Sequence, residues 1–316
     1  MLNVIILLIA GLIGLTVGAK MVVDSGKAVA HRLGVSELFI GLTIVSIGTS
    51  LPEIMVSVFS GVKEASDIAI GTMVGSCLTQ ITLILGIAGL IHNIKADRKA
   101  IRVDGTMLLL AIVLFWLTLF TGGIMTPFEA VILILIYIAY LVFTARHDSK
   151  AKEVAELGSH ERQGFPIGLR ILFLVIGFGI LIFSGNLVLD NSLLIAEYFD
   201  LSAAFVGVMI IGVATCLPEL STAVIAAFQG ASGIAIGALI GSNITDPLLS
   251  ASIGALFNGF EAGNHLLYFD IPVWFLGSVL ALSLLHRKKL TLFRWEAAAL
   301  IVFYLGFVGV KIGFGL

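Results

Sequence analysis

Two glutamates inside long apolar stretches are the residues of this 316-residue chain best suited to chemistry. Glu53 and Glu219 stand 166 residues apart, and each directly follows a proline. A carboxylate in the middle of a bilayer costs a few kcal/mol, so a pair at equivalent places predicts a polar site within the membrane. Pro52 and Pro218 each remove a backbone donor from a helix, which frees a carbonyl oxygen in the preceding turn.

Other oxygen-bearing side chains accompany both glutamates. Hydroxyls precede each one, and the next apolar stretch of each half carries a polar pair spaced by four residues, which places the pair on one helix face. The candidate set is Ser46, Thr49, Ser50, Ser76 and Gln80 in the first half, and Thr215, Ser242 and Asp246 in the second. Hard cations such as Ca²⁺ and Na⁺ prefer oxygen ligands of this kind. No His or Cys cluster in the sequence indicates a softer metal.

The chain is similar to itself when shifted by 166 residues. Residues 33–80 align without gaps to residues 199–246, with 18 of 48 positions identical. Each half holds about five apolar stretches, and an odd number means that the second copy enters the membrane from the opposite side. This pattern predicts an inverted repeat, with the site where interrupted helices of both halves meet. We expect a first repeat over 1–145, a cytoplasmic linker over 146–165 and a second repeat over 166–316.

Composition predicts an all-α polytopic membrane protein. Hydrophobic residues make up 59% of the chain and charged residues 12%, about half the share typical of soluble domains. The apolar stretches lack the alternation of barrel strands, and open sheets cannot cross lipid. About ten spans are expected, near residues 2–23, 37–61, 67–92, 105–121, 126–145, 167–190, 202–228, 232–257, 267–285 and 292–314. The N-terminal stretch lacks a basic leader, so we interpret it as a retained helix.

Charge distribution predicts the orientation in the cell membrane. Fifteen of the eighteen Lys and Arg lie in four alternate connections, which should therefore be cytoplasmic, with both termini outside. A net charge of −2 provides no basic surface for nucleic acid. The absence of HExxH and GxSxG argues against an intramembrane enzyme. We expect no cofactor, the lipid bilayer and transported ions as partners, and a monomer as the functional unit.

Four short segments resemble the two alpha repeats of the sodium/calcium exchanger family, within the cation/calcium exchanger superfamily. They are GTSLPE at 48–53, ATCLPE at 214–219, GTMVGSC at 71–77 and GALIGSN at 237–243. The resemblance implies that Glu53 and Glu219 coordinate the exchanged cations, with alternating access by sliding of the first and sixth helices. It also implies roles for the paired threonines Thr49 and Thr215, the serines Ser50, Ser76 and Ser242, the polar pair Gln80 and Asp246, and the backbone carbonyls of Ser46 and Gly212.

The sequence departs from the family pattern at several of these positions. Cys216 stands where the second repeat usually has Ser, and Gln80 is longer than the usual Asn. Thr72 and Ala238 replace an Asn, and Ala214 replaces a Gly. These changes keep the carboxylates and leave the Na⁺ sites and the stoichiometry open.

The function predicted from these features is an antiporter that exchanges Ca²⁺ for Na⁺. Glu53, Glu219 and Asp246 would carry three negative charges when ionised, which three Na⁺, or one Ca²⁺ and one proton, would neutralise. A Ca²⁺/H⁺ exchanger, or an exchanger of another divalent cation, is the alternative on the same fold; Cys216 and Gln80 favour it, whereas Asp246 and the serines favour Na⁺. A cation channel with a glutamate ring, and glutamates that only hold helices together, are weaker alternatives.

Overall fold

The protein is a bundle of long helices in a computed structural model that describes residues 1–32, 46–96, 98, 100–147, 166–287 and 290–314. Short π-helical segments, labelled η, interrupt several of the helices. The first half consists of α1 (Leu2–Arg32), α3 (Ser46–Thr49), α4 (Leu51–Val62), α5 (Ser66–Leu78), η2 (Thr79–Ile84), α6 (Leu85–Ile91), β1 (Ile94–Lys95), η3 (Ala100–Asp104), α7 (Gly105–Gly122), β2 (Ile124–Met125) and α8 (Pro127–His147).

The second half repeats this order of elements. It consists of α10 (Ile167–Tyr198), α11 (Ala203–Val206), η4 (Gly207–Ile211), α12 (Gly212–Thr215), α13 (Leu217–Phe228), α14 (Ser232–Thr245), η5 (Asp246–Ser250), α15 (Ala251–Asn258), β3 (Phe260–Glu261), η6 (Leu266–Asp270), α16 (Ile271–Leu285), β4 (Thr291–Leu292) and α17 (Arg294–Phe314). Most of the predicted linker, residues 148–165, lies outside the described residues; Arg146 and His147 end α8.

Eight helical segments of the described chain are long and apolar enough to cross a membrane, and a bent pair makes up to nine. The bent pair is Ala203–Thr215 with Leu217–Phe228, which meet at 44°. Of the predicted span 37–61, residues 37–45 lie outside the described part, and α3 and α4 form the remainder. Large apolar side chains such as Ile13 and Phe183 are exposed on the outside of the helices, as expected for surfaces that face lipid.

The two halves match in fine detail. Two short antiparallel strand pairs join the halves, β1 with β4 and β2 with β3. Two tyrosine–threonine hydrogen bonds also join them: Thr79 bonds to the Tyr304 hydroxyl at 3.2 Å, and Tyr137 bonds to Thr245 at 3.0 Å. The threonines are 166 residues apart and the tyrosines 167. Each half therefore uses the other to complete the same contacts.

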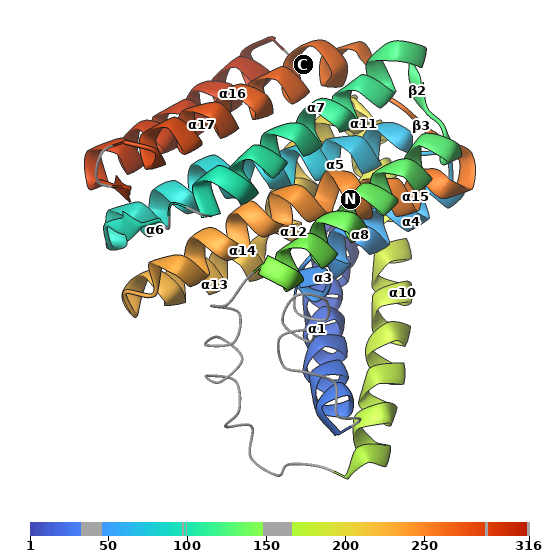
Figure 1. The fold of residues 1–316 in the computed structure, drawn as a ribbon. Coiled ribbons are helices and arrows are strands. Elements are labelled where there is room, and N and C mark those ends of the chain that lie inside the picture. Colours follow the sequence, from blue (N-terminus) through green and yellow to red (C-terminus); the bar gives the residue numbers. More distant parts are fainter. Residues whose placement is uncertain (33–45, 97, 99, 148–165, 288–289, 315–316) are drawn as a thin grey trace.

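Helices α1 and α10 pack along each other and run across the rest of the bundle (Figure 1). Small residues allow this approach, since a Cβ added to Gly18 would lie 3.1 Å from the Gly177 carbonyl oxygen. Among the described residues, each of these two helices packs more extensively against the other than against any helix of the bundle, and the main contact of α10 with the bundle is with α4.

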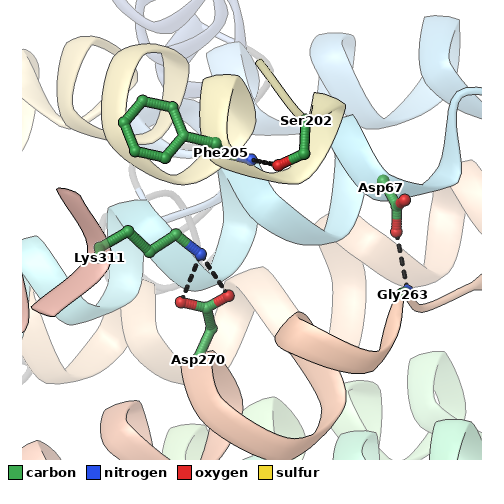
Figure 2. Close-up of polar contacts among 6 residues, drawn as sticks. All are labelled: Asp67, Ser202, Phe205, Gly263, Asp270 and Lys311. Carbon is green, nitrogen blue, oxygen red and sulfur yellow. Dashed lines mark hydrogen bonds and ion pairs between the residues drawn. The ribbon is translucent and has the colours of Figure 1, made fainter. Parts of the chain in front are cut away.

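Polar side chains fix several segments of the bundle (Figure 2). Ser202 caps α11 by accepting a hydrogen bond from the Phe205 N–H at 3.0 Å, and Asp67 accepts one from the Gly263 N–H at 2.8 Å. Lys311 is buried in α17, where its Nζ donates to both oxygens of Asp270 at 2.6 and 2.7 Å, and this carboxylate supplies the countercharge.

Candidate cation site

Each half breaks one membrane helix directly before its Pro-Glu pair. Ser50 separates α3 from α4 with φ −85° and ψ 7°, and Cys216 separates α12 from α13 with φ −85° and ψ 11°. Proline suits the first turn of the helix that follows, where its missing N–H is not needed. The sequence predicted interruptions at these prolines, and the breaks fall two residues earlier. Both glutamates therefore lie in the first turn of a helix that begins inside the bundle.

The broken helix of each half packs against the π-helical span of the other half. Helix α4 contacts η5 and α15, while α13 contacts η2 and α6. A π-helical turn holds one more residue than an α-turn, and such turns are frequent at functional sites. Gln80 lies in η2 and Asp246 begins η5, so the irregular turns carry the polar residues that the sequence singled out.

Three carboxylates meet in the interior of the bundle. Glu53, Glu219 and Asp246 are 2%, 1% and 0% exposed, and they are close enough for their charges to interact. Neither carboxylate oxygen of Glu53 has a hydrogen-bond partner within the described chain, and Glu219 has one oxygen in the same situation. A buried charge without a partner costs several kcal/mol, so these oxygens require a cation or a proton.

The ion pairs seen among the described residues lie away from the three carboxylates. Lys311 pairs with Asp270, Lys63 with Asp190 at 2.6 Å, and Arg287 with Glu296 at 3.2 Å. Within the described part of the chain, no Lys or Arg forms an ion pair with Glu53, Glu219 or Asp246.

Hydroxyl groups from both halves surround the carboxylates. Ser242 donates to Glu219 at 3.4 Å, and Ser76 donates to Asp246 at 3.4 Å. Each of the two threonines faces the glutamate of the other half: Thr215 faces Glu53, and Thr49 faces Glu219. The Ser50 hydroxyl is buried beside Asp246 without a hydrogen bond to a described residue.

Three other predicted residues lie at a helix break or in the short helix that precedes it. The Gly212 carbonyl accepts a hydrogen bond from the Thr215 hydroxyl at 3.3 Å. The Cys216 thiol donates to the Val213 carbonyl at 3.1 Å. Ser46 begins α3, and its side chain lies outside what the structure describes. Both thiols of the chain, Cys77 and Cys216, are buried and unlinked.

The carboxylates do not form a compact metal cluster by themselves. Among the described residues, no group of three His, Cys, Asp or Glu side chains could hold a metal ion without other ligands. Hydroxyls lie between the carboxylates instead, so a bound cation would share carboxylate, hydroxyl and carbonyl oxygens. Ca²⁺ and Na⁺ accept such mixed oxygen shells.

Four polar residues of the site were missed by sequence reasoning. Asn243, Ser250 and Cys77 lie one helical turn or less from predicted residues, and Ser250 and Cys77 contact Asp246 at 3.2 and 3.6 Å. Their positions inside apolar stretches could have indicated them. Trp274 bonds to Asn243 from another span, and nothing in the sequence links the two.

Comparison with known proteins agrees with the arrangement. The family model for the sodium/calcium exchanger protein matches residues 3–146 and again residues 169–313. The chain belongs to the sodium/calcium exchanger family. The sodium/calcium exchanger MaX1 of Methanosarcina acetivorans is 30% identical over 342 aligned positions, which cover 96% of this chain and 97% of that protein. The inner membrane protein YrbG of Escherichia coli strain K12 is 32% identical over 291 positions, or 90% and 89% of the two chains.

A solved structure supports the same fold. The sodium-calcium exchanger NCX_Mj, soaked with 10 mM Na⁺ and 10 mM Sr²⁺, matches with a TM-score of 0.65 and 27% identity over 98% of this chain and 99% of that one. The predicted family is thus confirmed, as is an integral multi-pass membrane protein. In this exchanger-family chain, each matched region contains a Pro-Glu helix break, and the next long helix after it is interrupted by a π-helical segment, η2 in the first region and η5 in the second.

Proposed function

We propose that this protein is a secondary active antiporter that exchanges Ca²⁺ for Na⁺ by alternating access. The observation that carries the proposal is the group of three buried carboxylates, Glu53, Glu219 and Asp246. They come from both halves, and none forms an ion pair with a described Lys or Arg. Such a site is stable only when positive charge enters it. Ions that compete for the same oxygens are then bound alternately, as exchange requires.

The architecture we propose is ten membrane helices in two inverted repeats, 1–145 and 166–316, joined by a cytoplasmic linker, with both termini outside. The reciprocal strand ladders and the two tyrosine–threonine contacts support a twofold relation between the halves. An inverted pair of this kind offers equivalent paths to either side of one enclosed site. The packing of α1 and α10 mainly against each other supports them as the pair of helices that slides along the bundle.

The cation ligands we propose are the two glutamates, aided by hydroxyl and carbonyl oxygens. Glu53 and Glu219 would hold Ca²⁺ together with Thr49 and Thr215, which face them across the interface. Na⁺ would use the flanking oxygens of Ser46, Ser50, Ser76, Gly212, Ser242 and Asp246. Gln80 and Cys216 would be weaker ligands, because the Gln80 carbonyl already accepts from Asn243 and Cys216 offers sulfur. Three Na⁺, or one Ca²⁺ with one proton, would neutralise the carboxylates.

A Ca²⁺/H⁺ exchanger is the second candidate. Asp246 receives hydrogen bonds from Ser76, Ser250 and the Cys77 thiol, so donors surround it on several sides. A carboxylate satisfied by donors needs a metal less than Glu53 does. Cys216 offers sulfur where oxygen would suit Na⁺.

Transport by purified protein in liposomes tests the proposal. Vesicles loaded with Na⁺ and placed in Na⁺-free medium should take up radiolabelled Ca²⁺, and vesicles loaded with choline should not. Uptake driven only by an imposed proton gradient would replace the first candidate with the second. Flux with neither driving gradient, or unsaturable flux, would favour a channel and refute both.

A charge-neutral variant tests the site itself. Glu53→Gln should reduce Ca²⁺ uptake to the level of protein-free vesicles, because the amide cannot balance the cation charge. Glu129→Gln is the matched control, since Glu129 only caps α8 through Thr126 and Gln can fill that role. Wild-type flux in Glu53→Gln would refute the assignment of the site.

A further inference from the structure

A continuous row of buried hydrogen bonds leads from α16 to the carboxylate of Asp246. The Trp274 indole Nε1 donates to Asn243 Oδ1 at 3.0 Å, and Asn243 Nδ2 donates to Gln80 Oε1 at 2.9 Å. Gln80 Nε2 then donates to the Ser76 hydroxyl at 3.4 Å, which donates to Asp246 Oδ2 at 3.4 Å. All five side chains are fully buried.

The direction of this row is set at its Trp274 end. An indole N–H can only donate, and a backbone carbonyl can only accept. Asn243 contacts one of each, because its Nδ2 also donates to the Leu239 carbonyl at 3.0 Å. The Asn243 amide can satisfy both partners in one orientation only, and its second N–H then points at Gln80. This fixes the carbonyl oxygen of Gln80 toward Asn243 and its NH₂ group toward Ser76.

The orientation determines what Gln80 offers to a cation. A cation needs an acceptor, and the Gln80 carbonyl oxygen accepts from Asn243 and is turned away from Ser76, toward which the NH₂ group points. At the equivalent position of the second half stands Asp246, which can only accept when ionised. The corner formed by Ser76, Gln80 and Asp246 therefore combines one carboxylate with one amide donor.

The first half has no counterpart of this device. The residues 166 positions before Asn243 and Trp274 are Cys77 and Leu108, which cannot hold an amide in this way. The Cys77 thiol instead contacts Asp246. The row of hydrogen bonds thus makes the two halves of the site unequal.

We propose that Asn243 and Trp274 are positioning residues that withhold the Gln80 carbonyl from the transported cations and so weaken Na⁺ binding at the corner next to Asp246. The proposal rests on the proposed exchange function. It differs from a merely structural role because its effect must pass through the amide of Gln80.

The test replaces the two positioning residues, Trp274 and Asn243, in one variant. The double variant Trp274→Phe with Asn243→Leu leaves no orphaned indole, and removing both partners of a hydrogen bond is far less costly than removing one. The freed carbonyl can then turn to the cation. We expect the half-saturating Na⁺ concentration to fall roughly fivefold, the equivalent of one net hydrogen bond, with a smaller change in maximal flux. Trp116→Phe is the control, because its indole donates at 3.0 Å to the Leu267 carbonyl, outside the row.

A second background separates positioning from general damage. In Gln80→Leu protein, adding the double substitution should leave the half-saturating Na⁺ concentration unchanged, because the amide is already absent. A shift of the same size in both backgrounds would overturn the proposal, as would an unshifted value in the double variant. For a variant whose flux is too low to measure, the half-saturating Na⁺ concentration is taken from the stabilisation by Na⁺ against thermal unfolding in detergent. Wild-type protein with neither Na⁺-driven uptake nor stabilisation would refute the exchange function instead.

Discussion

The buried ion pair of Asp270 and Lys311 allows a sharp test of how this bundle tolerates charge. Both side chains are 0% exposed, and Lys311 Nζ lies 2.6 and 2.7 Å from the two carboxylate oxygens (Figure 2). The equivalent carboxylate of the first half, Asp104, is only partly buried and accepts a hydrogen bond from the Tyr140 hydroxyl at 2.8 Å.

Removing only the lysine should be costly. Lys311→Met leaves Asp270 buried and unpaired, and breaking a buried pair in this way costs about 3–5 kcal/mol. At about 2–4 °C per kcal/mol for chains of 150–250 residues, the midpoint of thermal unfolding in detergent should fall by roughly 6–20 °C. The double variant Asp270→Asn with Lys311→Met removes both charges, so it should recover most of that loss.

Lys63→Met is the matched control. Lys63 also pairs with one aspartate, Asp190, but the two side chains are 34% and 48% exposed. Exposed pairs contribute about 1 kcal/mol or less, so the midpoint should change by no more than a few degrees. Equal loss in Lys63→Met and Lys311→Met, or a double variant at 270 and 311 no more stable than the single, would refute the reasoning.

Two further substitutions test packing and ion preference. Gly75→Ala should destabilise the protein by about 1–3 kcal/mol in a thermal assay, because its Cβ would lie 2.2 Å from the Val208 carbonyl oxygen. Gly241→Ala is the control and should not destabilise the protein, because its Cβ would meet no described atom within 4 Å. Equal losses of stability in the two variants would contradict the packing. Cys216→Ser should lower the half-saturating Na⁺ concentration about threefold in the liposome assay, since oxygen binds Na⁺ better than sulfur does. An unchanged value would place Cys216 outside the cation shell.

Local and repeated features of the sequence predicted much of the architecture. The lengths and positions of the apolar stretches predicted most spans to within a few residues, and the duplicated Pro-Glu pairs predicted the helix breaks. The α1 and α10 helices extend well beyond the predicted 2–23 and 167–190, to Arg32 and Tyr198, because their ends carry charged residues that hydropathy alone excludes. The π-helical segments were not predicted, since one extra residue in a turn leaves no clear mark on apolar periodicity.

Pairings between distant spans could not be predicted from the sequence. Lys311 lies close to the end of the last predicted span, and only the packing of α17 against the α16 and η6 region shows that Asp270 neutralises it. Asn243 stood inside a recognised motif, but its role depends on Trp274, which reaches it from another helix. In both cases tertiary packing determines which residue is the partner, and this packing cannot be predicted from a single sequence.

The difference between the two halves has a consequence for the charge of the site. Duplication placed a glutamate in each half, but position 80 is Gln where position 246 is Asp. Two identical halves with Asp at both positions would bring together four carboxylates, which three Na⁺ could not neutralise. Gln80 keeps the number at three, and Asn243 with Trp274 fixes its amide so that a donor faces Ser76 beside Asp246. The asymmetry therefore supports a site whose three negative charges are neutralised by three monovalent cations, or by one Ca²⁺ and one proton.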